Sequence, residues 1–93
     1  MPEFAISADH PALPGHFPGN PVVPGVVILE RVIALWTAAP VRGLDGVKFH
    51  HPLQPGETAT VRFQDPEKAA VKFSVTVNDR QLVTGRLLFE RGP

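Results

Sequence analysis

Residues 24–40 read PGVVILERVIALWTAAP, and this stretch decides the fold. Pro24 suits the first position of a helix, where its missing N–H costs nothing, and Pro40 ends the segment. Between the two prolines only Gly25, in the first turn, interrupts residues that are compatible with a helix. The sequence therefore predicts one helix over about residues 24–39, roughly 24 Å long at ~1.5 Å per residue.

The apolar side chains of this helix occupy every side of the helical wheel: Val26, Val27, Ile28, Leu29, Val32, Ile33, Leu35 and Trp36. A helix that is apolar all round cannot lie on a surface and must be surrounded by protein. We therefore expect a buried central helix, with any flank that the rest of the chain leaves open covered by a partner. Glu30 and Arg31 are its only charged residues.

Most of the remaining apolar residues alternate with polar ones, which is typical of strands. A short first strand is expected at Phe4 and Ile6, and longer ones at 47–50, 58–63, 71–77 and about 81–90, with a turn at Asn78-Asp79. Strands clustered after one apolar helix indicate an α+β domain, in which an antiparallel sheet curls around the helix. This is the hotdog arrangement, and we expect it to form a single domain over residues 1–93.

Composition excludes several classes of protein. The chain has 93 residues, too few for two domains, and its nine basic and nine acidic residues leave no excess charge for binding nucleic acid. It has no cysteine, so disulfide and thiolate chemistry are excluded. The N-terminal residues do not resemble a signal peptide and no apolar run is long enough to span a membrane, so we expect a soluble, cytoplasmic protein. Its small size favours oligomerisation.

The segment before the helix is rich in proline and glycine and contains His16. Five prolines between Pro11 and Pro24 each fix φ and disfavour helix in the preceding residue, so this segment is a stiff loop. Such a loop suits a positioned general base, and histidine is the commonest one. The alternative is a loop histidine that only bonds to a nearby carbonyl group.

Glu30 is the second candidate. Its helical neighbours three and four positions away, Val26, Val27, Ile33 and Ala34, are apolar, and a carboxyl group there loses hydration and tends to keep its proton. A protonated carboxyl group can act as a general acid. The alternative is a structural ion pair, which Arg31 of the same helix does not face but Arg31 of a second subunit could form.

The start of the helix is the third candidate. We expect the N–H groups of Gly25, Val26 and Val27 to be free at the positive end of the helix dipole, where they could stabilise a carbonyl oxygen that gains negative charge. Gly25 would let a ligand approach the backbone. The alternative is that water satisfies these groups. No metal-ligand spacing and no glycine-rich phosphate motif is present.

Residues 15–30, GHFPGNPVVPGVVILE, closely resemble the active-site segment of bacterial 3-hydroxyacyl-ACP dehydratases of the FabA/FabZ family, which are hotdog-fold enzymes. The family pattern is GHFPG, then PG, then an acidic residue on the central helix, and here Glu30 follows His16 by fourteen residues, as in the family. Residues 47–57, VKFHHPLQPGE, are similar to the strand and turn that follow in the family. Beyond Phe63 the resemblance is one of pattern only.

The resemblance implies a role for each candidate residue. His16 would take the proton next to the thioester carbonyl, and Glu30 would donate a proton to the departing 3-hydroxyl, giving a trans-2-enoyl thioester and water. Gly25 would hold the thioester oxygen through its amide, with Val26 and Phe17 beside the substrate, and the Val22 carbonyl would orient His16.

The resemblance also implies partners. The family's dimers place the histidine of one subunit against the acid of the other, so a homodimer with shared active sites is expected, and a higher oligomer or a heterodimer is an alternative. No metal or organic cofactor would be required. The substrate would arrive on acyl carrier protein, whose acidic surface would meet some of the chain's arginines: Arg31, Arg42, Arg62, Arg80 and Arg86.

Two departures from the family keep other functions open. Fatty-acid dehydratases commonly carry Gln four residues after the acid, where this chain has Ala34, and they have additional elements before the active-site segment. Compact dehydratase-like proteins of polyketide and aryl-polyene pathways resemble this chain better, so such a pathway is at least as well supported as fatty-acid synthesis. The remaining alternatives are a hotdog acyl thioesterase and a non-catalytic partner that binds acyl-ACP.

Overall fold

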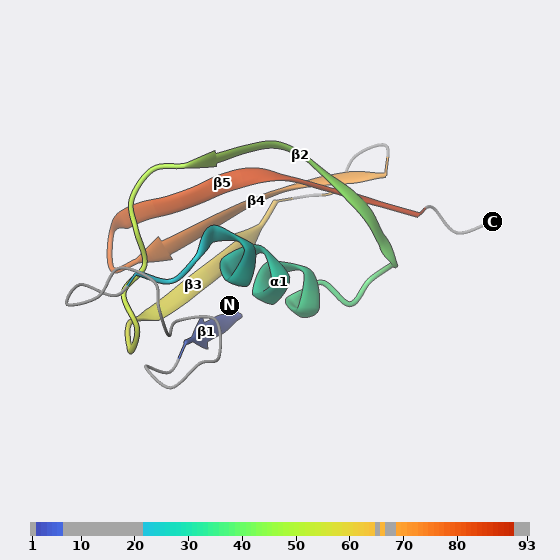
Figure 1. Ribbon diagram of the computed structural model, residues 1–93. Helices are drawn as coiled ribbons and strands as arrows, with labels where there is room; N and C mark the ends of the chain where they lie inside the picture. Colours follow the sequence, from blue (N-terminus) through green and yellow to red (C-terminus); the bar gives the residue numbers. More distant parts are fainter. Residues whose placement is uncertain (1, 7–21, 65, 67–68, 91–93) are drawn as a thin grey trace.

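The computed structural model describes residues 2–6, 22–64, 66 and 69–90. In chain order they form a short strand, one helix and four further strands (Figure 1): β1 (Glu3–Ala5), α1 (Gly25–Leu35), β2 (Val41–Phe49), β3 (Thr58–Phe63), β4 (Ala70–Val77) and β5 (Arg80–Phe89).

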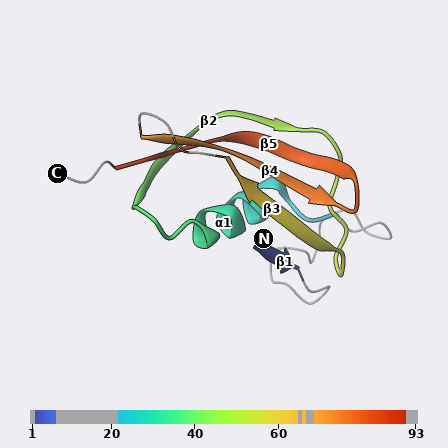
Figure 2. The same ribbon diagram turned by 180° about the vertical axis from the view of Figure 1, so that it is seen from behind.

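The strands form one antiparallel sheet in the order β1-β3-β4-β5-β2, so β1 and β2 are its edges. Figures 1 and 2 show from opposite sides that the sheet arches over α1, which lies against its concave face. This arrangement confirms the predicted α+β hotdog fold.

The core lies between α1 and the sheet. In β4 the period-two pattern places Val71, Phe73 and Val75 on the buried face, each at most 3% exposed. The helix contributes Val27, Ile28 and Val32 to the same cluster. Burying a side chain of this size stabilises the fold by about 1.5–3 kcal/mol, so this contact holds the helix on the sheet.

The helix is shorter than predicted, because it ends at Leu35 and not near residue 39. Trp36 is already extended, with φ −88° and ψ 108°. Its ring packs against Phe63 and Phe89, with centroids 5.1 and 5.4 Å away, and this contact favours leaving the helix at that point. No helix of the described residues is long and apolar enough to cross a membrane.

The single chain leaves open a flank of the helix, of the kind for which a partner is expected. The sheet covers only one side of α1, and on the other side Val26 is 61% exposed, with Glu30 and Ala34 one and two turns further along also exposed. The apolar pattern of α1 therefore includes a side of the helix that this chain alone does not cover.

Strand β2 begins at Val41, six residues before the predicted strand. Its pairing with β5 shifts register between Val41 and Gly43 and again between Asp45 and Lys48, where Gly46 has φ +61°. Each extra residue in a bulge breaks the alternation of side chains. The period-two pattern consequently fails in the first half of β2.

Candidate active site

The N-terminus of α1 is the centre of the candidate site. Pro24 is the N-cap residue, and its carbonyl oxygen accepts the N–H of Val27 at 3.0 Å. The expectation of three free amides is therefore wrong for Val27. The N–H groups of Gly25 and Val26 precede this first hydrogen bond of the helix and have no partner among the described residues, so within this part of the chain both are donors at the positive end of the dipole.

Two backbone contacts fix where this helix end lies. Val23, just before α1, donates its N–H to the carbonyl oxygen of Leu53 at 2.8 Å, and both side chains are buried. His50 donates its N–H to the carbonyl oxygen of Leu82 at 2.7 Å. Together these bonds tie the start of α1 to the segment after β2, and that segment to β5.

Gly25 faces the aromatic ring of Phe49. A Cβ atom placed on Gly25 would come within 2.7 Å of two ring carbons of Phe49, closer than real Cβ contacts allow. Phe49 is itself 55% exposed, which is unusual for a ring of this size. The absence of a side chain at Gly25 therefore lets the end of β2 lie directly against the start of the helix.

A cavity of about 310 Å³ opens at this position. Its wall is mostly apolar and comes from the start of α1 and the segment after β2: Val22, Val23, Gly25, Ile28, Phe49, His50, His51, Pro52 and Leu53. A concave apolar site with a few polar groups is typical of small-molecule binding, and this one has the glycine of the helix N-terminus in its wall.

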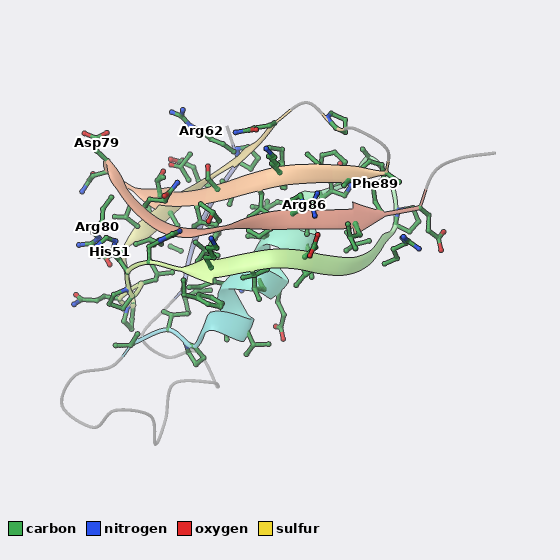
Figure 3. The ribbon with its side chains drawn as sticks, turned by 90° about the horizontal axis from the view of Figure 1, so that it is seen from above. His51, Arg62, Asp79, Arg80, Arg86 and Phe89 are labelled. Atoms are coloured by element: carbon green, nitrogen blue, oxygen red, sulfur yellow. The ribbon has the colours of Figure 1, made fainter. Side chains whose placement is uncertain are left out.

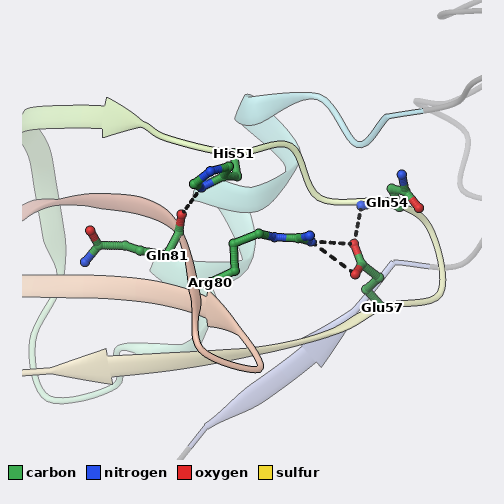
Figure 4. A network of polar contacts seen from close by, with 5 residues as sticks. All are labelled: His51, Gln54, Glu57, Arg80 and Gln81. Atoms are coloured by element: carbon green, nitrogen blue, oxygen red, sulfur yellow. Dashed lines mark hydrogen bonds and ion pairs between the residues drawn. The ribbon is translucent and has the colours of Figure 1, made fainter.

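The two histidines of the cavity wall have different partners. The Nε2 atom of His50 lies 3.0 Å from Oγ1 of Thr84, and the Nδ1 atom of His51 donates to the carbonyl oxygen of Gln81 at 2.8 Å (Figure 4). A proton on Nδ1 leaves Nε2 of a neutral His51 ring as the acceptor. Both rings are therefore held in place by β5.

A polar network supports the turn beyond the histidines. One carboxylate oxygen of Glu57 accepts the backbone N–H of Gln54 at 2.9 Å, and the other lies 3.3 Å from a guanidinium nitrogen of Arg80 (Figure 4). Gly56 adopts φ +89° between them, which glycine permits without strain. The turn after β2 is thus tied to the start of β5.

The structure brings some of the predicted site residues together and leaves others apart. Val22 and Gly25 both line the cavity, whereas Val26 lies on the exposed side of α1 and is not part of its wall. Glu30 is exposed on that same side, so the loss of hydration predicted for it is not provided by this chain alone. His16 and Phe17 lie outside the described residues.

Sequence reasoning identified Val22 and Gly25 but missed the other seven residues of the cavity wall, Phe49 and His51 among them. Phe49 lies in a predicted strand and His51 in the segment similar to the family's strand and turn, so neither was a candidate site residue. The available signal was Pro52, three residues after the end of β2, because a proline soon after a strand marks where the chain leaves the sheet and turns. Among the described residues, no group of three His, Asp or Glu could hold a metal ion.

Comparison with known proteins supports a relationship along nearly the whole chain. A family model described as ApeI-like, ApeI dehydratase, matches residues 2–86. The 3-hydroxyacyl-[acyl-carrier-protein] dehydratase FabZ of Roseiflexus sp. (strain RS-1) is 31% identical over 103 aligned positions, covering 94% of this chain and 72% of that protein. FabZ of Thermomicrobium roseum is 35% identical over 71 positions, covering 63% of this chain.

A solved structure also resembles the chain. A chain of the dehydratase heterocomplex ApeI:P from Xenorhabdus doucetiae superposes with a TM-score of 0.78 at 26% identity, covering 96% of this chain and 84% of that one. The matches to the first two curated relatives cover 48% and 51% of their own length, so this chain spans about half of them.

Proposed function

This chain belongs to the ApeI-like dehydratase family, and we propose that it converts a 3-hydroxyacyl thioester carried on acyl carrier protein into the trans-2-enoyl thioester and water. The observation that carries the proposal is the apolar cavity at the N-terminus of α1, with Gly25 in its wall. An acyl chain fits an apolar wall, and a thioester oxygen beside Gly25 meets the donors of the helix end.

The reaction needs a group that stabilises negative charge on the thioester oxygen. As the proton leaves C2, electron density moves onto this oxygen, and the N–H of Gly25 would donate a hydrogen bond to it. The helix dipole adds a partial positive charge at the same point. Removing one such donor typically costs 10²–10³ in turnover, so Gly25 would be a principal contributor.

Two side chains would move the protons. His16 takes the C2 proton as general base, and Glu30 in its protonated form donates a proton to the 3-hydroxyl oxygen. The C3–O bond breaks, water leaves, and the electron pair of the C2–H bond forms the C2=C3 double bond. The spacing of His16 and Glu30 and the family relationship support these roles.

Three further residues would complete the substrate site. The Val22 carbonyl would orient His16, and Phe17 and Val26 would contact the substrate. The position of Val22 in the cavity wall supports its proposed role. Val26 is on the uncovered side of α1, so it could contact the substrate only in an active site that a second chain completes.

We propose that this second chain is another copy of the protein and that two copies share their active sites. The uncovered side of α1, with Val26 and Glu30, needs a covering surface before Glu30 can lose hydration. The edge of β2 lies nearby and carries two exposed apolar side chains, Leu44 and Phe49, which would pair across a two-fold axis. In this dimer His16 of the partner subunit would face Glu30.

The experiment that tests the proposed function is turnover of a 3-hydroxyacyl or an enoyl thioester by the purified chain, with its oligomeric state measured in parallel. We expect His16→Ala to abolish turnover and His10→Ala, in the same segment, to preserve it. Normal turnover by His16→Ala would overturn the proposal. Release of free thiol without an enoyl product would indicate a thioesterase instead.

A further inference from the structure

The face of the sheet turned away from α1 carries a row of polar and basic side chains. Register pairs across four strands join Arg62 to Ser74, Ser74 to Thr84, and Thr84 to Lys48. Residues directly opposite one another project from the same face of a sheet, so all four side chains lie on the outer face. Arg62 and Lys48, at the two ends of the row, are exposed.

A second row runs beside the first. Lys72 of β4 lies opposite Arg86 of β5, and Arg86 lies opposite Asp45 of β2, with which it forms an ion pair. Lys72 and Arg86 carry like charges directly opposite each other, which destabilises a sheet. Asp45 offsets the charge of Arg86 but not that of Lys72. The acid Glu3 is on the same face but at the far edge, where it pairs with Thr60.

The two rows therefore hold four exposed basic residues, Lys48, Arg62, Lys72 and Arg86, against the single acid Asp45. We call these four residues the basic face; Figure 3 looks onto it. Because the whole chain has nine basic and nine acidic residues, this positive charge is a local concentration and not a property of the composition.

The basic face lies next to a residue of the cavity wall. The row of Lys48 and Thr84 ends beside His50, whose ring lies 3.0 Å from the Thr84 hydroxyl and which also lines the cavity. A large molecule bound on the basic face would therefore lie next to the part of the cavity wall that His50 forms. Pairing through the β2 edge would extend the sheet and leave this face open.

We propose that the basic face is the docking surface for the protein that carries the acyl chain, and that this carrier presents an acidic surface to it. The inference rests on the proposed function, since it is the proposed reaction that brings a protein-bound substrate to the cavity. Charge complementarity selects an acidic partner and raises the rate at which carrier and enzyme meet. A second copy is disfavoured, because two basic faces repel each other.

The test compares a carrier-bound substrate with a small uncharged one. Lys48→Gln with Arg62→Gln removes both charges of the row nearest the cavity, and Lys48→Arg with Arg62→Lys keeps them as the matched control. Turnover is measured with the acyl carrier protein thioester and with the N-acetylcysteamine thioester of the same acyl group. Binding of the acyl carrier protein is measured separately by calorimetry at low and high salt.

We expect the charge-removing variant to lose at least tenfold in kcat/KM and in binding with the carrier, and to stay within twofold on the small thioester. The charge-keeping variant should match the unsubstituted protein in both assays. Unchanged carrier binding after charge removal, or an equal loss on both substrates, would overturn the proposal. The proposal would also be overturned if the basic face bound a nucleic acid and not the carrier, and if the charge-removing variant lost that binding.

The two proposals fail in different ways. If the unsubstituted chain turns over neither thioester, the proposed function fails, while calorimetry with acyl carrier protein still tests the docking surface. If it turns over both but carrier binding does not depend on Lys48 and Arg62, the docking surface alone is wrong.

Discussion

Phe49 lies with its ring against the backbone of Gly25, so closely that a Cβ atom on the glycine would be 2.7 Å from two ring carbons. This contact joins the end of β2 to the first residue of α1. It also places an exposed aromatic ring in the wall of the cavity, beside the amide that the proposed reaction uses. The position of the ring and the access to the amide are therefore coupled.

The first prediction concerns Gly25→Ala. The added methyl group forces the Phe49 ring to move, because the two cannot occupy the same space. The atoms that must move are the far end of a half-exposed ring, so we expect the free energy of unfolding to change little. We expect kcat/KM to fall by at least tenfold while the chain still folds, as measured by turnover and by urea unfolding.

Gly43→Ala is the matched control, since its Cβ atom would meet Leu88 at an ordinary 3.7 Å. Adding Phe49→Leu to Gly25→Ala should recover part of the lost turnover, because the smaller side chain makes room for the methyl group. If Gly25→Ala behaves like Gly43→Ala in both assays, the contact has no part in activity.

The second prediction separates the chemistry of Glu30 from stability. Since Glu30 is exposed in the single chain, Glu30→Gln should change the free energy of unfolding of the dissociated chain by no more than about 0.5 kcal/mol. Turnover should fall by about 10²–10⁴, as expected for loss of a general acid. Glu3→Gln, another exposed glutamate, should leave turnover unchanged. Full activity in Glu30→Gln would exclude Glu30 as the acid.

The third prediction addresses the second copy. Leu44 is exposed on the β2 edge, and Leu44→Lys would place a charge where two edges are proposed to meet. We expect this variant to be monomeric in sedimentation and to lose turnover, because Glu30 then remains uncovered. Leu44→Met should stay dimeric and active. An active monomer would contradict the shared active site.

The fourth prediction concerns the buried anchor of the cavity. Leu53 is fully buried, and its carbonyl oxygen holds Val23 just before α1. Leu53→Ala should lower the free energy of unfolding by about 2–5 kcal/mol, whereas Leu53→Met should cost less than about 1.5 kcal/mol. Both values are measurable by urea titration. An equal loss of stability in the two variants would mean that neighbouring side chains repack into the space left by Leu53.

Local patterns predicted most of the fold and less of the site. The alternation in β4 is regular because one of its faces is buried along its whole length, so the pattern identified it. The early start of β2 could not be predicted, because Gly46 and the bulge interrupt the alternation there. The helix end at Leu35 depends on the packing of Trp36 against rings that are distant in the sequence.

The same distinction holds for the candidate site. Gly25 could be identified as the first residue of the helix because it directly follows Pro24, and a helix start depends on neighbouring residues. Its contact with Phe49 depends on how β2 pairs with β5, which no short motif encodes. The exposure of Glu30 in the single chain could not be predicted, because the apolar pattern of α1 does not reveal which chain covers it.

The lengths of the two sheet edges also limit how the molecule can assemble. Among the described strands, β2 offers nine residues at one edge, while β1 offers three at the other. Growth of a fibril by stacking sheets edge to edge needs two long free edges on each molecule. In the proposed dimer, in which two copies join through β2, only the short β1 edges would face outward, so polymerisation would stop at the pair.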